Sequence, residues 1–286
     1  MPERVALLAP AKVNLALHVT GRRADGFHLL DSIAVFADVC DRVEIEAVDT
    51  LSLSVTGPFA AHAPGDASDL AWRAAVAFFE HTGRKPAVAI RVEKNIPAGA
   101  GLGGGSGDAA GVLKGLDRHF GTRLPADDLT AIGLKLGADV PMCLAGHALR
   151  ARGIGDDIRS IEGWPPLPMV LIWPGVPVST AAVFKSLQRR DNPPLGEPPR
   201  GASVEALASW LAGCRNDLEA SALTIAPEIG EALTSLRATD GCLLARMSGS
   251  GSACFGVYRT RSEAEEAASR LRVAGSHWWI VATEAR

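Results

Sequence analysis

The sequence lacks a clustered cysteine pattern. Its five cysteines are scattered along the chain, they are odd in number, and no two of them form a C-x-x-C pair. This usage argues against a disulfide framework and against a zinc site of the usual spacing. It predicts that the chain works in a reducing compartment.

The sequence also lacks a surplus of positive charge and any long apolar run. The formal net charge is −3, so there is no electrostatic footprint for nucleic acid and no polybasic surface for a membrane. The N-terminus M-P-E-R-V-A-L-L-A-P has no long apolar h-region, and no stretch approaches the length needed to span a bilayer. We therefore expect a small-molecule partner and a cytoplasmic location.

The chain does have the length and apolar content for a large core. It has 286 residues, of which 47% are hydrophobic and 21% are charged, as in ordinary globular proteins. This length exceeds the usual single domain of about 100–150 residues. A proline-rich stretch, W-P-P-L-P at 164–168, is typical of a domain junction. We predict two domains, 1–162 and 163–286.

The most informative stretch is residues 94–111, which read K-N-I-P-A-G-A-G-L-G-G-G-S-G-D-A-A-G. Its glycines allow positive φ and leave no Cβ to obstruct a ligand. A helix is expected to follow, with Ser106 as a candidate N-cap and Gly121 at the C-terminal end. Unpaired amides and the positive end of the helix dipole meet at such a junction. The stretch therefore predicts a site for a phosphate or another anion.

Other interpretations of this loop stay open. Gly99, Gly101 and Gly104 match the G-x-G-x-x-G fingerprint of nicotinamide-dependent oxidoreductases. However, residues 94–98 separate these glycines from the predicted strand at 87–92, whereas the fingerprint turns almost directly out of its strand. A Walker loop needs Gly-Lys-Ser/Thr at its end, and none is present. A tight turn without a ligand is the third possibility.

Hydrophobic periodicity predicts an α+β protein with interleaved strands and helices. The expected strands are 5–19, 43–47, 51–55, 87–92, 169–173, 242–247, 253–258 and 278–283. The expected helices are 68–80, 106–120, 127–136, 204–211 and 227–237, with others starting at 179 and 262. We expect 43–47 and 51–55 to be antiparallel strands, and the helix at 262 to begin with a capping box of Ser262 and Glu265.

Three further features carry candidate polar groups. Lys12 and Asn14 lie on the same face of the first strand, which is either a solvated face or part of a site. Asp139 precedes Pro141 in G-A-D-V-P, as an N-cap does before a helix, and a cap at a loop can still face a cleft. The stretch S-G-S-G at 248–251 is either a simple hairpin turn or a second backbone cradle that faces the glycine loop.

Four motifs together resemble the GHMP small-molecule kinases over nearly the whole chain. They are A-P-A-K-V-N-L at 9–15, P-A-G-A-G-L-G-G-G-S at 97–106, G-A-D-V-P at 137–141 and S-G-S-G at 248–251. The resemblance implies an N-terminal nucleotide domain similar to ribosomal protein S5 and a ferredoxin-like C-terminal domain, with the active site in the cleft between them. It also implies transfer of the γ-phosphoryl group of ATP, with Mg²⁺, to the hydroxyl of a small molecule.

The G-R-R-A-D-G-F-H segment at 21–28 extends the resemblance to kinases whose acceptor is a cytidine-diphosphate-linked methylerythritol. By that resemblance Asp139 takes the hydroxyl proton, and Lys12 orients the partners and stabilises developing negative charge. His28 reads the cytosine edge. Phe27 and Phe184 stack on the faces of the base. Asn14 and Thr180 line the substrate channel. The ATP-binding residues are Asp69, Leu70, Lys94, Pro97, Ala98, Gly99, Ala100, Gly101, Leu102, Gly103, Gly104, Gly105, Ser106 and Gly107, and Ser106 is the candidate Mg²⁺ ligand.

The chain departs from the family pattern at two places. Phe27 stands where tyrosine is common, and S-G-D at 106–108 replaces the usual S-S-N. Asp108 either helps to hold Mg²⁺ or favours the helix N-terminus, as acidic residues do. The alternatives are another GHMP kinase with a different alcohol, a nicotinamide-dependent oxidoreductase, and a silent nucleotide-binding regulator, against which Lys12 and Asp139 both argue. No oligomeric state is predicted.

Overall fold

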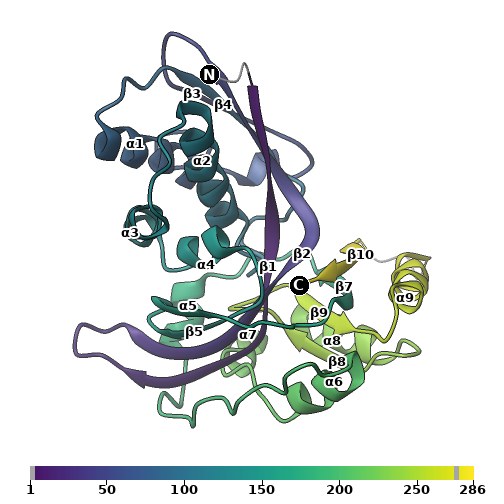
Figure 1. Ribbon diagram of the computed structural model, residues 1–286. Coiled ribbons are helices and arrows are strands. Elements are labelled where there is room, and N and C mark those ends of the chain that lie inside the picture. Colours follow the sequence, from purple (N-terminus) through teal and green to yellow (C-terminus); the bar gives the residue numbers. More distant parts are fainter. Residues whose placement is uncertain (1–3, 274–276) are drawn as a thin grey trace. The chain divides into compact units, whose positions relative to one another are not determined.

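The computed structural model describes residues 4–273 and 277–286, and the chain divides into two compact units. Unit 1 comprises 1–12, 39–98 and 103–146, and unit 2 comprises 13–38, 99–102 and 147–286. Strands β1 (Arg4–Arg22) and β2 (His28–Ala47), the long purple strands of Figure 1, pair with each other and supply residues to both units. The predicted domains, 1–162 and 163–286, are contiguous segments and so differ from these two units. The boundary between the predicted domains stays a prediction.

The sheet of unit 1 contains the second half of β2 together with β3 (Ser52–Thr56) and β4 (Val88–Glu93). Strand β4 pairs antiparallel with β2 and parallel with β3. The predicted strands 43–47 and 51–55 therefore both exist and run antiparallel, as expected, but they do not pair with each other, because β4 lies between them. Their alternating pattern defines which side chains are buried and does not identify the neighbouring strand.

Helices that pack on one another and, through α2, on this sheet complete unit 1 (Figure 1). They are α1 (Leu70–Thr82), α2 (Gly104–Phe120), α3 (Ala126–Leu136) and α4 (Val140–Ala145), and a short 3-10 turn, η1 (Ala60–His62), precedes α1. Helices α1 and α2 both end at a left-handed glycine, Gly83 and Gly121, as predicted. A Cβ on Gly115 would lie 2.6 Å from Cδ1 of Ile45, so α2 packs directly on the sheet.

The N-termini of two helices differ from the prediction. Helix α1 is capped by Asp69, whose Oδ1 accepts a hydrogen bond from the amide of Ala71 at 2.9 Å, and Ser68 lies outside the helix. Helix α2 has Gly103 at its N-cap position, so Ser106 lies in the first turn and does not cap it. The glycine run continues into the helix because Gly104 and Gly105 adopt helical geometry there.

Unit 2 is built on an antiparallel sheet whose central strand is buried at every residue. Its strands are β5 (Leu149–Gly153), β6 (Asp157–Ser160), β7 (Leu167–Trp173), β8 (Leu244–Met247), β9 (Cys254–Val257) and β10 (Trp279–Ala285). Strand β7 lies between β10 and β9, and β9 pairs with β8. Strand β5 pairs with the first half of β2 and with β6. The order of these strands places the continuous apolar run of β7 at the centre, where both faces are covered.

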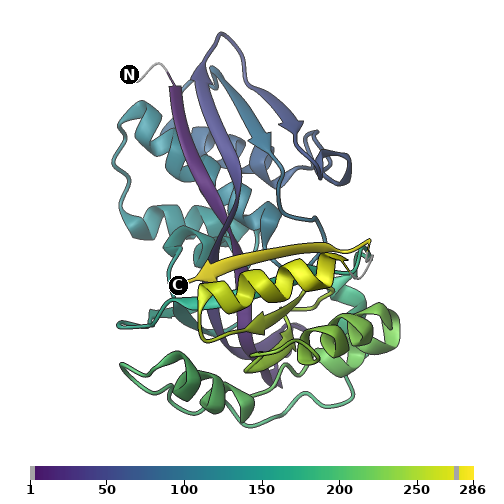
Figure 2. The same cartoon turned by 90° about the vertical axis from the view of Figure 1, so that its right-hand side faces the viewer.

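The helices of unit 2 are α5 (Thr180–Lys185), α6 (Val204–Ala212), α7 (Glu219–Ile225), α8 (Glu228–Arg237) and α9 (Arg261–Val273). Figure 2 shows α9 lying along β10. The predicted capping box at Ser262 and Glu265 is wrong by two residues. The amide of Glu263 donates to Thr260 Oγ1 at 3.2 Å, and the amide of Thr260 donates to Glu263 Oε2 at 3.3 Å. Helix α7 was not predicted because it is short and has no side-chain cap. No helix in the described ranges is long and apolar enough to cross a membrane.

A buried histidine on α2 makes the stability of the fold depend on pH. His119 is 1% exposed, and neither ring nitrogen has a hydrogen-bond partner among the described residues. Burial lowers the pKa of His119 below its ordinary value of 6.5. The unfolded chain therefore binds more protons below that pH. The neutral ring contributes its full stability above pH 6.5, and this contribution is lost as the pH falls toward the folded-state pKa.

We expect His119→Leu to flatten the dependence of the unfolding free energy on pH. Urea unfolding in a series of buffers should show a slope smaller by up to about 1.4 kcal/mol per pH unit below roughly pH 6.5, the value for one proton. Wild-type protein unfolded in the same buffers gives the reference slope. A wild-type slope in His119→Leu would contradict the role of this ring.

Candidate functional site

Lys12 and Asp139 form an ion pair in unit 1. Strand β1 carries Lys12, whose side chain is 4% exposed, and its Nζ lies 2.9 Å from Oδ2 of Asp139. Asp139 occupies the N-cap position of α4, with proline in the first turn as predicted, but its side chain makes no capping hydrogen bond. The carboxylate is instead directed to Lys12. The sequence left open whether Asp139 only caps the helix or also turns toward a cleft. The geometry favours a role other than capping.

The N-terminus of α2 lies against this lysine. Gly103 is left-handed with φ 68°, and a Cβ there would lie 3.2 Å from Cβ and 3.3 Å from Cε of Lys12. Only glycine satisfies both the backbone conformation and the close approach. The first amide that bonds back into the helix is that of Gly107, which donates to Gly103 O at 2.8 Å. The preceding amides are at the positive end of the helix dipole, beside an ammonium group, and this arrangement suits a phosphate.

The glycine loop continues in unit 2, where residues 99–102 pack against the β8–β9 turn. A Cβ on Gly101, at φ 76°, would lie 2.6 Å from Ser248 O. Ser248 Oγ donates to Gly101 O at 3.1 Å, and the amide of Ala253 donates to Ala100 O at 2.9 Å. The S-G-S-G stretch is therefore both the turn of a hairpin and a surface that faces this part of the glycine loop.

Asn216 holds the same turn in place, and sequence reasoning missed it. Its Nδ2 donates to the carbonyls of Met247 and Gly249 at 2.9 and 2.8 Å, and its Oδ1 accepts from the amide of Leu218 at 3.0 Å. The short segment before α7 gives no periodic signal that would have identified it. Asn216 is therefore a positioning residue for the turn at 248–251.

Asn14 has a buried acceptor atom without a hydrogen-bond partner in the part of the chain that the structure describes. Its backbone amide donates to Ser248 Oγ at 3.1 Å, and its side-chain Nδ2 donates to Ser32 Oγ at 2.8 Å. These bonds fix the side chain, yet Oδ1 is buried without a hydrogen bond among the described residues. A buried unpaired acceptor is costly, so it points to a ligand donor. Thr180, the other predicted channel residue, shares a hydrogen bond of 2.8 Å between its Oγ1 and Ser250 Oγ.

His28 and Phe184 come together as a stacked pair. Their ring centroids are 4.9 Å apart and the rings are 27° from parallel. Nε2 of His28 is buried and has no hydrogen-bond partner among the described residues. Burial lowers the pKa of His28, and the charges of Arg22 and Arg190 lower it further, so the environment favours the neutral ring. Phe27, also predicted to stack, is 60% exposed. The arrangement can read the edge of a planar ligand.

Lys94 and Asp108 belong to a buried cluster with Asp41. The Lys94 Nζ pairs with Asp41 and lies 2.5 Å from Asp108 Oδ2, and all three side chains are at most 5% exposed. Burial lowers the pKa of Lys94, but the two carboxylates outweigh burial and raise it. Burial and Asp41 raise the pKa of Asp108 against the effect of Lys94. Both interpretations of Asp108 overlooked this pairing. The side chain of Asp108 is buried, and it shares Lys94 with Asp41.

The remaining residues predicted for the adenosine pocket lie near the start of α1. Asp69 caps that helix and its Oδ2 accepts from the amide of Gly65 at 3.2 Å. A Cβ added to Gly105 would lie 3.5 Å from Cδ1 of Leu70, so the Leu70 side chain is next to the first turn of α2. The ammonium of Lys94 is occupied by carboxylates. The assignment of these residues to adenosine stays a prediction.

A second buried ion pair, which the sequence did not reveal, fixes the proline-rich segment of unit 2. Arg150 on β5 donates to both carboxylate oxygens of Asp31 on β2, at 2.7 and 2.8 Å. Arg150 also donates to Leu195 O at 2.6 Å and to Glu197 at 2.7 Å, and the amide of Leu195 donates to Asp31 at 3.0 Å. We call residues 192–197 the strap. Asp31 directly precedes Ser32, which holds Asn14.

The residues present could hold Mg²⁺ if a bound phosphate supplied some of its ligands. Among the described residues, no group of three or more His, Cys, Asp or Glu side chains is arranged to hold a metal ion. Mg²⁺ in nucleotide sites usually takes one or two protein ligands and completes its shell with phosphate and water. The Ser106 hydroxyl, in the first turn of α2, suits that role. Asp108 does not, because its carboxylate pairs with Lys94.

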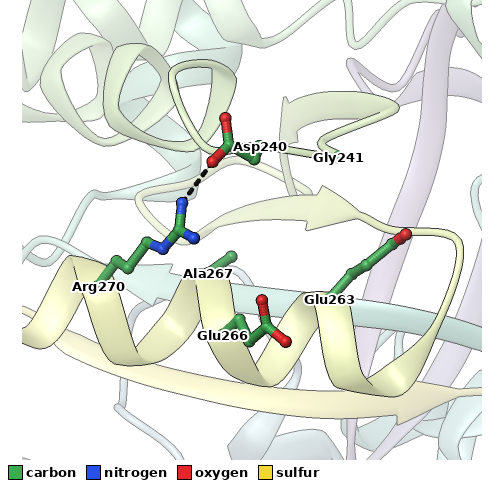
Figure 3. A pocket seen from close by; sticks show the side chains of 6 residues that line it. All are labelled: Asp240, Gly241, Glu263, Glu266, Ala267 and Arg270. Carbon is green, nitrogen blue, oxygen red and sulfur yellow. Dashed lines mark hydrogen bonds and ion pairs between the residues drawn. The ribbon is translucent and has the colours of Figure 1, made fainter.

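A small acidic cavity in unit 2 is unrelated to these groups. It measures about 130 Å³ and is lined by Asp240, Glu263, Glu266 and Arg270 (Figure 3). Asp240 pairs with Arg270, and Glu263 accepts from the amide of Thr260 in the capping box. Two of its three carboxylates, Asp240 and Glu263, therefore already have partners within the fold.

The family model described as "GHMP kinases N terminal domain" matches residues 69–147, and that of "GHMP kinases C terminal" matches residues 201–277. The solved structure of a homoserine kinase from Cytophaga hutchinsonii is 17% identical to this chain and has a TM-score of 0.73. The match covers 100% of this chain and 95% of the homoserine kinase. This likeness shows the fold. The fold and the family models define a two-domain α+β small-molecule kinase.

The more similar proteins narrow this class. A protein of Mesorhizobium japonicum named 4-diphosphocytidyl-2-C-methyl-D-erythritol kinase is 49% identical over 96% of this chain and 94% of its own length. A protein of the same name from Cereibacter sphaeroides is also 49% identical, over 95% and 96%. A crystal structure of 4-(cytidine 5'-diphospho)-2C-methyl-D-erythritol kinase is 38% identical and has a TM-score of 0.81, with 99% and 100% coverage. The chain belongs to the GHMP kinase family, as its motifs predicted.

Proposed function

We propose that the protein transfers the γ-phosphoryl group of ATP to the 2-hydroxyl of 4-diphosphocytidyl-2-C-methyl-D-erythritol. The products are the 2-phosphate and ADP, and the reaction belongs to non-mevalonate isoprenoid precursor biosynthesis. The names of the relatives and of the 38% identical structure support this acceptor. The observation that carries the chemistry is the ion pair of Lys12 and Asp139 beside Gly103 at the start of α2.

Asp139 is the proposed general base. Its carboxylate is the acceptor for the proton of the attacking hydroxyl, and the ion pair with Lys12 fixes its position. Lys12 is buried and positively charged, so it stabilises the negative charge that develops as the hydroxyl oxygen attacks phosphorus. Phosphoryl transfer requires little more than positioning and such electrostatic stabilisation.

The start of α2 is the proposed phosphate site. The amides of Gly104, Gly105 and Ser106 precede the first bond within the helix and donate to phosphate oxygens. The Ser106 hydroxyl would hold Mg²⁺, which neutralises phosphate charge when it is bound. The buried cluster of Asp41, Lys94 and Asp108 supports the same turn from behind, because Lys94 Nζ lies 3.3 Å from the place of a Cβ on Gly104.

His28 is the proposed reader of cytosine. A neutral imidazole offers one donor and one acceptor, and Nε2 is the nitrogen left free. Phe184 covers one face of the ring and keeps it in place. Asn14 Oδ1 and the Thr180–Ser250 pair provide polar contacts for the alcohol portion of the substrate. The cytoplasmic location stays a prediction.

We expect His28→Ala to separate the two substrates kinetically. Losing a hydrogen bond and its packing is worth about 1–1.5 kcal/mol, so KM for the cytidine substrate should rise by about tenfold while KM for ATP changes less than about twofold. Steady-state kinetics with each substrate varied in turn measures both values. His81→Ala, at an exposed position on α1, is the control. Equal increases in the two KM values would contradict base reading by His28.

The experiment that tests the function incubates the protein with ATP, Mg²⁺ and 4-diphosphocytidyl-2-C-methyl-D-erythritol and follows ADP release. We expect turnover that depends on the cytidine substrate, with the phosphate appearing on the 2-hydroxyl by ³¹P NMR. Folded protein that releases no ADP above background would overturn the proposal. Turnover with another alcohol alone would favour a different GHMP kinase activity. Calorimetry that showed tighter binding of NAD(P) than of ATP with Mg²⁺ would favour the oxidoreductase alternative.

A further inference from the structure

Arg190 is an arginine in unit 2 that has no partner for its charge among the described residues. Its Nε is buried and makes no hydrogen bond, and within the described ranges its guanidinium has no ion pair. The neighbouring Arg189 differs, because its Nε lies 3.3 Å from Oδ1 of Asp191 and its side chain is 68% exposed. A buried guanidinium nitrogen without an acceptor is costly. The cost is removed when an anion or a carbonyl oxygen binds there.

The backbone on both sides of Arg190 is fixed. Leu187 is 5% exposed and packs in the core of unit 2. Asn192 donates to Val19 O on β1 through its amide at 3.0 Å and through Nδ2 at 3.3 Å. These contacts anchor the segment that joins α5 to the strap. Arg190 is therefore held close to its position before any ligand arrives, which lowers the entropy lost on binding.

Arg190 lies near His28. In the chain it lies between Phe184, whose ring stacks on His28 with centroids 4.9 Å apart, and Asn192, which donates to Val19 O on β1. The positive charges of Arg190 and Arg22 also lower the pKa of the His28 ring. Arg22 donates its Nε to Gly26 O at 3.2 Å, but it has no carboxylate partner in the described part of the chain, whereas Arg23 pairs with Asp25 at 2.7 Å. Among the described residues, the two segments next to His28 thus each carry a guanidinium group without a counter-charge, and Nε2 of His28 has no hydrogen-bond partner. A ligand that combines a planar base with negative charge matches these groups.

We propose that Arg190, assisted by Arg22, forms an anion subsite that binds a phosphate of the nucleotide whose base is held at His28. This assignment rests on the proposed function, in which that nucleotide is a cytidine diphosphate ester. The planar guanidinium matches phosphate oxygens in a two-bond geometry and keeps its charge at every relevant pH. The subsite distinguishes a nucleotide from a nucleoside, since the nucleoside has no group for Arg190.

Calorimetry with two probes tests the subsite directly. Cytidine and cytidine diphosphate share the base and ribose and differ in the phosphates. We expect the wild type to bind the diphosphate more tightly, and Arg190→Ala to weaken its binding by about 10- to 100-fold, as for loss of a charge-assisted hydrogen bond, while cytidine affinity changes by less than about twofold. Arg190→Lys, which keeps the charge but loses the two-bond geometry, should fall between them.

Arg189→Ala is the matched control, because it removes the same side chain one residue earlier in the same segment. It should leave both affinities unchanged, and thermal melting of each variant should show an intact fold. Equal losses for cytidine and cytidine diphosphate in Arg190→Ala would overturn the phosphate assignment and favour contact with the base. No loss for either probe, or no preference of the wild type for the diphosphate, would also overturn it.

The turnover assay separates this subsite from the proposed function. If cytidine diphosphate binds as expected and the wild type releases no ADP with the cytidine substrate, the function is wrong and the subsite stands. If the wild type turns over and Arg190→Ala has an unchanged KM for the cytidine substrate, the subsite is wrong and the function stands. A raised KM for that substrate with an unchanged KM for ATP would support both.

Discussion

Replacing Asp139 by asparagine is expected to lower kcat by about 10²–10⁴-fold, the usual contribution of a positioned general base. The amide has the shape of the carboxylate, and its oxygen still accepts a hydrogen bond from Lys12, which lies 2.9 Å from the native carboxylate. It cannot accept the proton of the substrate hydroxyl. ADP release measures kcat, and thermal melting checks the fold. Calorimetry measures ATP affinity, which should change by less than about fivefold because Asp139 is not a phosphate ligand.

The same variant decides between the two interpretations of Asp139. Asparagine is as good an N-cap as aspartate. If Asp139 only began helix α4, Asp139→Asn would keep wild-type turnover and stability. Asp127→Asn, an exposed acidic residue in the first turn of α3, is the control for a lost surface charge. Unimpaired turnover in Asp139→Asn would remove this residue from the mechanism.

The elements of the fold follow from local patterns wherever burial follows a period. Helix α2 could be predicted because its apolar residues recur at helical spacing and Gly121 ends it. The start of the same helix could not, because its N-cap is a glycine whose conformation depends on close approach to Lys12. The neighbour of each strand was also beyond prediction. The alternation of β3 is the same whether β2 or β4 lies beside it.

The candidate site divides in the same way. Lys12, Asn14, Asp139 and the glycine loop lie in short motifs, so the sequence identifies them. The ion pairs that support the site join residues far apart in sequence: Asp41 is 53 positions from Lys94, and Asp31 is 119 positions from Arg150. No local pattern connects such partners. A charged residue among the apolar residues of a buried strand was the one available signal, and Asp31, Asp41 and Arg150 all show it.

The pair of Asp31 and Arg150 should matter more to stability than any surface ion pair. Their side chains are 2% and 6% exposed. Asp31→Ala leaves a buried guanidinium without its two-bond partner and should cost about 3–5 kcal/mol of unfolding free energy, measured with urea. Asp25→Ala is the control, because the pair of Arg23 and Asp25 is 2.7 Å long but half-exposed, and its loss should cost less than about 1 kcal/mol.

A double variant shows whether the charge or the packing carries this effect. In Asp31→Ala with Arg150→Leu no buried charge is left, so the double variant should be more stable than Asp31→Ala alone, although it loses two partners. The strap should still loosen, because the amide and carbonyl of Leu195 lose their side-chain partners. Hydrogen exchange at the amide of Leu195, which donates to Asp31 in the native fold, should therefore increase in both variants. Additive losses, with the double variant the least stable, would mean that packing and not charge pairing dominates at this position.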